Sequence, residues 1–110
     1  MIYVNDRTKV LGHMGVPLAT VKWRGGASRG FDRVPVVEKR ADAPREQFGT
    51  AVVLAEQVLR VCDIPSYIVE RHYDPDMRSH EALAAKAKSK GLTARSLVSV
   101  VLFMVGTAHG

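Results

Sequence analysis

The most constraining feature of this sequence is a nearly uninterrupted apolar run close to its end. From Ser96 to Val105 only the two serines, Ser96 and Ser99, are polar. An element that is apolar on every face cannot be exposed to water, so this run must be buried against its own chain or against a second copy. The need for a partner surface therefore limits both the fold and the assembly state.

The residues before this run predict a helix with a defined end. Residues 82–90 are nearly all good helix formers. Gly91 can adopt the left-handed conformation that commonly ends a helix, and Thr93 can cap a following one. We therefore expect two consecutive helices, of which the second covers the apolar run.

Length and composition predict one ordinary domain, 1–110. The chain has 110 residues, of which 46% are hydrophobic and 25% are charged, enough for a single modest core. Cys62 is the single cysteine, so no internal disulfide can form and nothing indicates an oxidising compartment. The apolar run is shorter than the roughly 20 residues that span a bilayer. We expect a cytoplasmic protein without a membrane partner.

The charges are arranged in blocks. Lys and Arg outnumber Asp and Glu by 16 to 11, with a pI near 9.7. Residues 1–45 and 77–110 are basic, whereas residues 46–76 are acidic. Two basic ends favour a polyanion such as nucleic acid as partner, although basic ends could also pair with the acidic middle of a neighbouring subunit. A basic surface without a dedicated partner is the third possibility.

The remaining patterns predict a mixed fold. Residues 1–4 and 16–23 are typical of strands. A central helix is predicted over 44–63, because Pro44 suits the first helical position and apolar residues follow at three- and four-residue spacing. Residues 67–73 are β-branched and aromatic enough for a strand. We therefore expect an α+β fold: a basic strand-and-loop region, 1–43, then the central amphipathic helix, then a strand-helix-helix unit, 67–106.

The order of elements in residues 67–106 also carries a family resemblance. Pro75 precedes the first expected helix, Leu83 and Ala87 share its buried face, and Gly91, Thr93 and Leu97-Val98 follow. In this order the positions resemble the ribbon-helix-helix family of MetJ/Arc-type repressors. The resemblance implies an intertwined homodimer that inserts its paired strands into the major groove of DNA. It implies a transcription regulator, from a bacterium or phage, that reads DNA through residues 67–73.

Two alternatives use the same residues. The spacing of Ala87, Gly91, Leu97 and Val100 is similar to that of a helix-turn-helix, in which the second helix enters the groove. An ordinary helical hairpin, whose corner at Gly91 is only a cap, would look the same. The sequence leaves these alternatives open.

The candidate nucleic-acid contacts combine three regions. The segment from Arg24 to Arg33 interleaves cations with Trp23 and Phe31, whose rings could stack on bases. The expected strand, the second half of the first expected helix and the start of the second supply the others. The predicted nucleic-acid-binding residues are Lys22, Arg24, Arg29, Arg33, Arg71, Lys86, Lys88, Lys90, Thr93 and Arg95. The predicted oligomer interface is Leu97, Val98, Val101, Leu102 and Val105.

Catalytic and metal sites are not predicted. The stretch from His72 to His80 holds side chains that a divalent metal accepts, but Pro75 and Asp76 explain it as a turn and a cap. Glu38-Lys39-Arg40 after Asp32 only partly matches a metal-dependent nuclease site. We expect no enzyme, no cofactor and no metal.

Two function classes follow from these patterns. The first is a homodimeric DNA-binding regulator, and the second is a non-catalytic assembly subunit of a phage virion or ribonucleoprotein. Burial of residues 94–106 against residues 44–62 of the same chain would favour the subunit.

Overall fold

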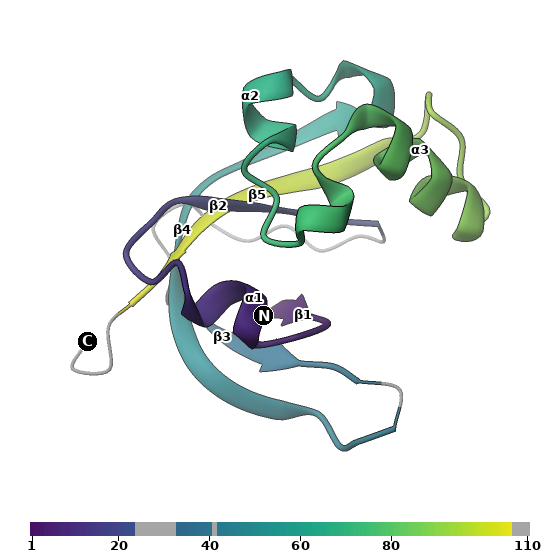
Figure 1. Cartoon of the computed structure of the whole chain (residues 1–110). Coiled ribbons are helices and arrows are strands. Elements are labelled where there is room, and N and C mark those ends of the chain that lie inside the picture. Colours follow the sequence, from purple (N-terminus) through teal and green to yellow (C-terminus); the bar gives the residue numbers. More distant parts are fainter. Residues whose placement is uncertain (24–32, 41, 107–110) are drawn as a thin grey trace.

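A five-stranded curled sheet forms the centre of the molecule (Figure 1). The computed structural model describes residues 1–23, 33–40 and 42–106. The strands are β1 (Ile2–Val4), β2 (Leu18–Lys22), β3 (Arg33–Glu38), β4 (Glu46–Arg60) and β5 (Leu97–Val105), in the spatial order β1-β3-β4-β5-β2. Only β1 and β3 pair in parallel; the other neighbours are antiparallel. The sheet is a half-barrel with β1 and β2 as its two edges.

Short helices lie on both sides of this sheet (Figure 1). The α-helices are α1 (Thr8–Leu11), α2 (Ser66–Val69) and α3 (His80–Ser89), and the 3₁₀ turns are η1 (Val61–Asp63) and η2 (Pro75–Met77). α2 and α3 cover one face of β4, β5 and β2, whereas α1 lies near β1 on the other side. Among the described elements, no helix has the length and apolar character that a membrane crossing requires.

The apolar run is buried because β5 contributes to two cores. Val101, Phe103 and Val105 face the inner core with β1 and α1. Val98 and Val100 face the outer core, where Leu83 and Ala87 of α3 pack against them. Successive side chains of a strand point to opposite faces, so a strand that is covered on both faces has no polar side.

The predicted second helix over the apolar run is therefore wrong. β5 pairs with β4 on one side and with β2 on the other. A short continuous apolar run suits a buried strand or a buried helix equally well. Pairing with β4 and β2 makes the run a strand. The surface that buries it belongs to the same chain.

The predicted central helix over 44–63 is also wrong, because these residues form β4. The strand carries a bulge between Val53 and Ala55 where it pairs with β5. A bulge inserts one extra residue and breaks the two-residue alternation of buried side chains. The bulge places Val52, Ala55 and Leu59 on one face at three- and four-residue spacing, which is part of the pattern that predicted a helix.

The predicted strand over 67–73 is replaced by a helical turn. α2 begins after Pro65, whose carbonyl accepts hydrogen bonds from the backbone N–H groups of Ile68 (3.0 Å) and Val69 (3.1 Å). Among the described residues, the one β-bridge between this region and the sheet joins His72 to Ala19. Residues 67–106 thus run helical turn, helix, strand, which excludes both the ribbon-helix-helix and the helix-turn-helix arrangements. The fold is mainly β rather than α+β.

Locally encoded elements agree with the sequence. The strands predicted over 1–4 and 16–23 correspond to β1 and β2. α3 spans the predicted helical segment, and Gly91 follows it with a φ of 76°. The backbone N–H of Leu92 donates to the carbonyl of Ala87 at 2.9 Å, which closes the last turn.

Candidate nucleic-acid interface

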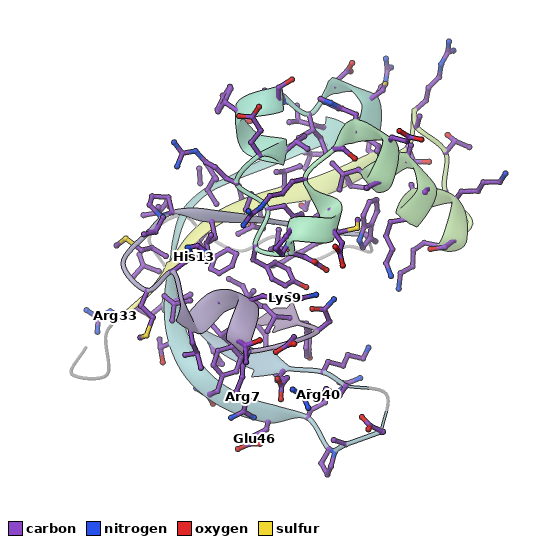
Figure 2. All side chains as sticks on the ribbon, in the orientation of Figure 1. Arg7, Lys9, His13, Arg33, Arg40 and Glu46 are labelled. Atoms are coloured by element: carbon purple, nitrogen blue, oxygen red, sulfur yellow. The ribbon has the colours of Figure 1, made fainter. Side chains whose placement is uncertain are left out.

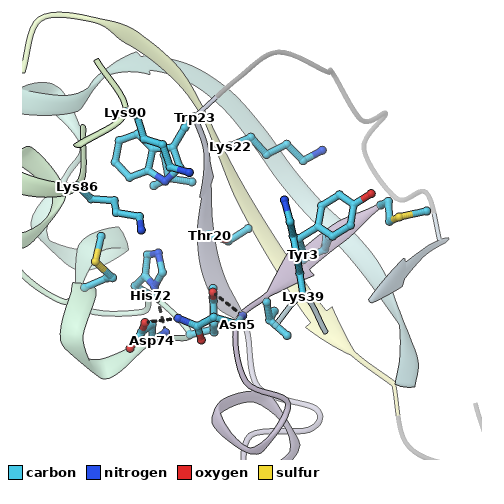
Figure 3. A pocket seen from close by; sticks show the side chains of 16 residues that line it. Tyr3, Asn5, Thr20, Lys22, Trp23, Lys39, His72, Asp74, Lys86 and Lys90 are labelled. Carbon is cyan, nitrogen blue, oxygen red and sulfur yellow. Dashed lines mark hydrogen bonds between the residues drawn. The ribbon is translucent and has the colours of Figure 1, made fainter. Parts of the chain in front are cut away.

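An open groove lies between the two edge strands of the half-barrel (Figure 3). Its volume is about 650 Å³. One wall is β1 with Lys39, the other comes from η2 and α3, and the end of β2 lies between them. We call this site the basic groove. The residues that line it are Met1, Ile2, Tyr3, Val4, Asn5, Thr20, Val21, Lys22, Trp23, Lys39, His72, Tyr73, Asp74, Met77, Lys86 and Lys90.

Residues 72–74 close one end of the groove and join its walls. Ala19 on the edge of β2 donates its backbone N–H to the carbonyl of Arg71 at 2.8 Å and accepts from the N–H of Tyr73 at 3.0 Å. From the β1 side, the backbone N–H of Asn5 donates to the Tyr73 hydroxyl at 3.3 Å. β1 and β2 do not pair with each other. At this end of the groove the loop of residues 72–74 contacts both and so links the two edge strands.

The carboxylate of Asp74 holds this loop in place, and its charge is balanced by an ion pair and by hydrogen bonds. It is 5% exposed, and its Oδ1 lies 3.1 Å from Lys9 Nζ. Asn5 Nδ2 and the Asp76 backbone N–H each donate to the carboxylate at 3.0 Å. Burial alone would raise the pKa of Asp74, but these hydrogen bonds and the Lys9 ammonium outweigh it, so the pKa is lowered. Asp74 is consequently a structural anchor and adds little negative potential to the groove.

The lysines of the groove come from separate parts of the chain. Lys86 and Lys90 lie four residues apart, so they share one side of α3, next to the face that buries Leu83 and Ala87. Lys39 follows β3 and donates its backbone N–H to the carbonyl of Val4 at 2.8 Å, which places it at the end of β1. Within the described ranges, no carboxylate forms an ion pair with Lys39, Lys86 or Lys90. Like charges held together without counter-charges create a positive potential that attracts an anion.

Aromatic rings accompany these charges. Tyr3 is 43% exposed, and Lys39 Nζ lies 5.9 Å from the centre of its ring, a cation–π distance. Trp23 lines the groove from the end of β2 and packs partly against the outer core. Ring faces beside cations form the combination that binds stacked bases together with phosphates.

The structure brings together some of the predicted nucleic-acid contacts and separates others. Lys22, Lys86 and Lys90 line the basic groove. Arg33 lies on β3, away from the groove (Figure 2), and Arg71, Lys88 and Arg95 are exposed elsewhere. Thr93 is in the turn before β5, where its hydroxyl accepts from the Arg95 N–H at 3.3 Å. Arg24 and Arg29 lie outside the described residues.

The predicted oligomer interface is mostly used inside the chain. Val98, Val101 and Val105 are buried in the two cores, and Leu102 packs against the outer one. Leu97 alone among these five is strongly exposed, at 64%. The expected homo-oligomer stays a prediction, but burial of the apolar run no longer requires it.

Tyr3, Lys39 and His72 line the groove but were not among the predicted contacts. Tyr3 alternates with two buried residues in β1, so its exposure could have been inferred from the expected strand. Lys39 and His72 were considered only as parts of a nuclease or metal pattern. Nothing in the local sequence indicates that β1, the end of β3 and residue 72 meet, because their contacts are long-range.

Glu38 and His80, two of the groups weighed for catalysis or metal binding, make structural contacts, whereas Asp32 lies outside the described residues. Glu38 accepts from the Arg7 backbone N–H at 2.7 Å and from Arg7 Nη2 at 3.1 Å, and these bonds lower its pKa. His80 Nε2 lies 2.6 Å from the Ile64 carbonyl. Across residues 1–23, 33–40 and 42–106, no three His, Cys, Asp or Glu side chains gather as a metal site.

Comparison of the chain with models of known families, with curated proteins and with solved structures finds no match.

Proposed function

We propose that this protein is a non-catalytic nucleic-acid-binding protein that holds a single strand in the basic groove. The observation that carries this proposal is the convergence of Lys39, Lys86 and Lys90 around an open groove, where no described carboxylate pairs with them. Tyr3 adds an exposed ring on the same lining. Such an arrangement costs folding stability through repulsion, and a bound polyanion would relieve it.

A single strand fits the groove better than a duplex does. In a duplex the faces of the bases are stacked on one another, so a protein ring cannot reach them without unstacking. A single strand presents its phosphates to cations and its bases to rings at the same time. The proximity of Lys39 to Tyr3 supports this combined contact.

The chemistry of the groove supports binding rather than catalysis. Asp74 is held by three donors, so its lowered pKa makes it a poor proton acceptor. The pKa of His72 is lowered to about 4, mainly by burial, which makes it a weak base near neutral pH. Neither group has the pKa near the working pH that general acid–base catalysis needs.

Fluorescence anisotropy with a labelled oligothymidylate of about ten nucleotides tests the proposal. We expect binding at low salt that weakens steeply as salt is added. Lys86→Gln and Lys90→Gln should each weaken binding and reduce the log–log salt slope by about 0.7. Lys88→Gln is the matched control, because Lys88 is on the same helix but does not line the groove.

Two results would contradict nucleic-acid binding in the groove, and a third would contradict its preference for a single strand. One is the absence of binding at low salt, and the other is an equal effect of Lys88→Gln and Lys86→Gln. Tighter binding of a duplex than of the single strand would show that the groove does not select single strands.

A second candidate is the non-catalytic assembly subunit. The burial of β5 against β4 of the same chain is the arrangement that favours this class over a dimeric regulator. Val58 and Leu97 are each 64% exposed and lie on the same face of the adjacent strands β4 and β5. If this face associates, light scattering should show an oligomer of the parent protein that Leu97→Asp dissociates. A monomer at all concentrations would leave the face without a role in self-association.

A further inference from the structure

His72 occupies a fixed position at the floor of the basic groove. The residue is 6% exposed, and its ring stacks on Tyr73 with centroids 4.9 Å apart. Its carbonyl accepts from Arg78 Nε at 2.8 Å, and its backbone bridges to Ala19 of β2. In Figure 3 the ring stands between Asp74 and the end of Lys86. The ring therefore has little freedom to turn.

The hydrogen bonds of this ring determine its tautomer. The backbone N–H of Asp74 donates to Nδ1 of His72 at 3.0 Å. A backbone N–H can only donate, so Nδ1 must be the unprotonated acceptor. The proton of the neutral ring then resides on Nε2. His72 thus offers an N–H donor in the groove that Lys86 and Lys90 also line.

We propose that the Nε2–H of His72 donates a hydrogen bond to a phosphate oxygen of the bound strand, in a phosphate subsite shared with Lys86 and Lys90. This inference rests on the proposed function. Lys86 and Lys90 supply the positive charge of the subsite, while the fixed Nε2–H of His72 orients the phosphate oxygen that accepts from it. The exposed ring of Tyr3 lies on the opposite wall, where a base can stack. The groove therefore separates phosphate contacts from base contacts.

Burial, more than the surrounding charges, keeps the His72 ring neutral. Asp74 favours the protonated ring, whereas Arg78 and Lys9 oppose it, and Lys22, Lys39, Lys86 and Lys90 line the same groove. Burial has the largest effect and lowers the pKa of His72 to about 4. The ring accordingly contributes a donor without a charge near neutral pH. A neutral donor displaces no counterion from the ligand, so it adds affinity without adding salt dependence.

NMR of the His72 ring in the parent protein tests this inference directly. The two probes are an oligothymidylate of about ten nucleotides and an abasic deoxyribose-phosphate chain of the same length. At pH 7 the free protein should show the Nε2–H tautomer, and both probes should shift its proton downfield. The Nδ1–H tautomer would overturn the inference. A shift that only the base-bearing probe produces would assign the contact to a base and overturn it as well.

Variants of His72 provide the second test. Asn at position 72 can keep the acceptor for the Asp74 N–H but lacks a donor at the Nε2 position, whereas Gln can supply one. We expect His72→Asn to weaken binding of the oligothymidylate by about tenfold with an unchanged salt slope. His72→Gln should restore part of the affinity, and His13→Asn, a change outside the groove, should have no effect.

The two proposals can fail separately. If the oligothymidylate does not bind at low salt, the proposed function is wrong. If it binds with a salt slope that depends on Lys86 and Lys90, but the His72 Nε2–H resonance does not move, only the phosphate contact of His72 is wrong. The NMR measurement needs no variant, so poor folding of His72→Asn leaves the test intact.

Discussion

At the scale of single residues, buried polar groups connect the two edges of the half-barrel. Asp74 binds Lys9 and Asn5 from the β1 side, and His72 accepts the Asp74 N–H. Among the described residues, no buried side-chain nitrogen or oxygen lacks a hydrogen-bond partner. These groups fasten the loop of residues 72–74 to β2 through Ala19 and to Asn5 and Lys9 on the β1 side.

The lowered pKa of His72 predicts that the folded state loses stability as the pH falls from 7 to 4. In the unfolded chain the ring titrates near 6.5, whereas in the fold its pKa is about 4. The unfolded state therefore binds a proton first as the pH falls, and this favours unfolding. We expect the free energy of unfolding to drop by about 3 kcal/mol between pH 7 and pH 4 because of this residue. Urea unfolding should show a smaller drop for His72→Asn, with His13→Asn as the control.

Removal of the Asp74 charge should destabilise the protein at neutral pH. Asp74→Asn removes the partner of Lys9 and at least one acceptor at a buried site, with an expected cost of about 1–3 kcal/mol at pH 7. The lowered pKa of Asp74 implies that the ionised carboxylate stabilises the fold at neutral pH. This stabilisation is lost as the pH falls below the ordinary pKa of an aspartate and through the lowered one. The difference in the free energy of unfolding between the parent and Asp74→Asn should thus become smaller in acid. Asp76→Asn, at an exposed neighbour, should change the stability little.

At the scale of elements, β4 and β5 depend on their neighbours, whereas α3 is defined locally. β5 is a strand because β4 and β2 pair with it and helices cover its outer face. α3 instead carries its own stop signal in Gly91. Its N-terminus is capped by Ser79, whose Oγ accepts the Ala82 N–H at 3.1 Å.

The end of α3 provides a clean test of this local signal. Gly91 has a φ of 76°, and nothing lies within 4 Å of the position of an added Cβ. Gly91→Ala should therefore cost about 1 kcal/mol through backbone strain alone. Gly12→Ala is the matched control, because Gly12 has a φ of −72° and its added Cβ meets only the Thr8 carbonyl, at 4.0 Å. Equal stabilities of the two variants in urea would show that the left-handed turn is not strained by Ala.

At the scale of the whole molecule, an excess of positive charge is concentrated at one opening. The chain carries a formal net charge of +5, and the groove collects Lys22, Lys39, Lys86 and Lys90. A site that is built to hold an anion is expected to reduce the stability of the empty protein.

Loss of a groove charge should consequently stabilise the empty protein. Lys86 and Lys90 are a like-charge pair four residues apart on α3, so Lys86→Gln should raise the free energy of unfolding by a few tenths of a kcal/mol at low salt. Added salt should raise the stability of the parent more than that of the variant. Thermal unfolding at two salt concentrations measures both effects. A variant that is less stable than the parent at low salt would show that the favourable interaction of Lys86 with the C-terminal end of α3 outweighs its repulsion by Lys90.

The sequence by itself determined the elements whose signals are local. α3 follows from its helix formers and from Gly91, and β1 and β2 follow from short apolar patterns. It also singled out Lys22, Lys86 and Lys90. Two predicted elements were wrong for one physical reason: an apolar run shows that residues are buried, but not whether strands or helices bury them. The bulge in β4 added a misleading helical spacing.

Only the tertiary structure decided where the groove lies. The parallel pairing of β1 with β3 brings Tyr3 and Lys39 to one edge, and the bridge from His72 to Ala19 brings the closing loop to the other. These contacts join residues that are far apart in the chain, and their stability comes from burial and hydrogen bonds that exist only after folding. Local sequence therefore determined which charges are available, whereas long-range pairing determined which of them surround one site.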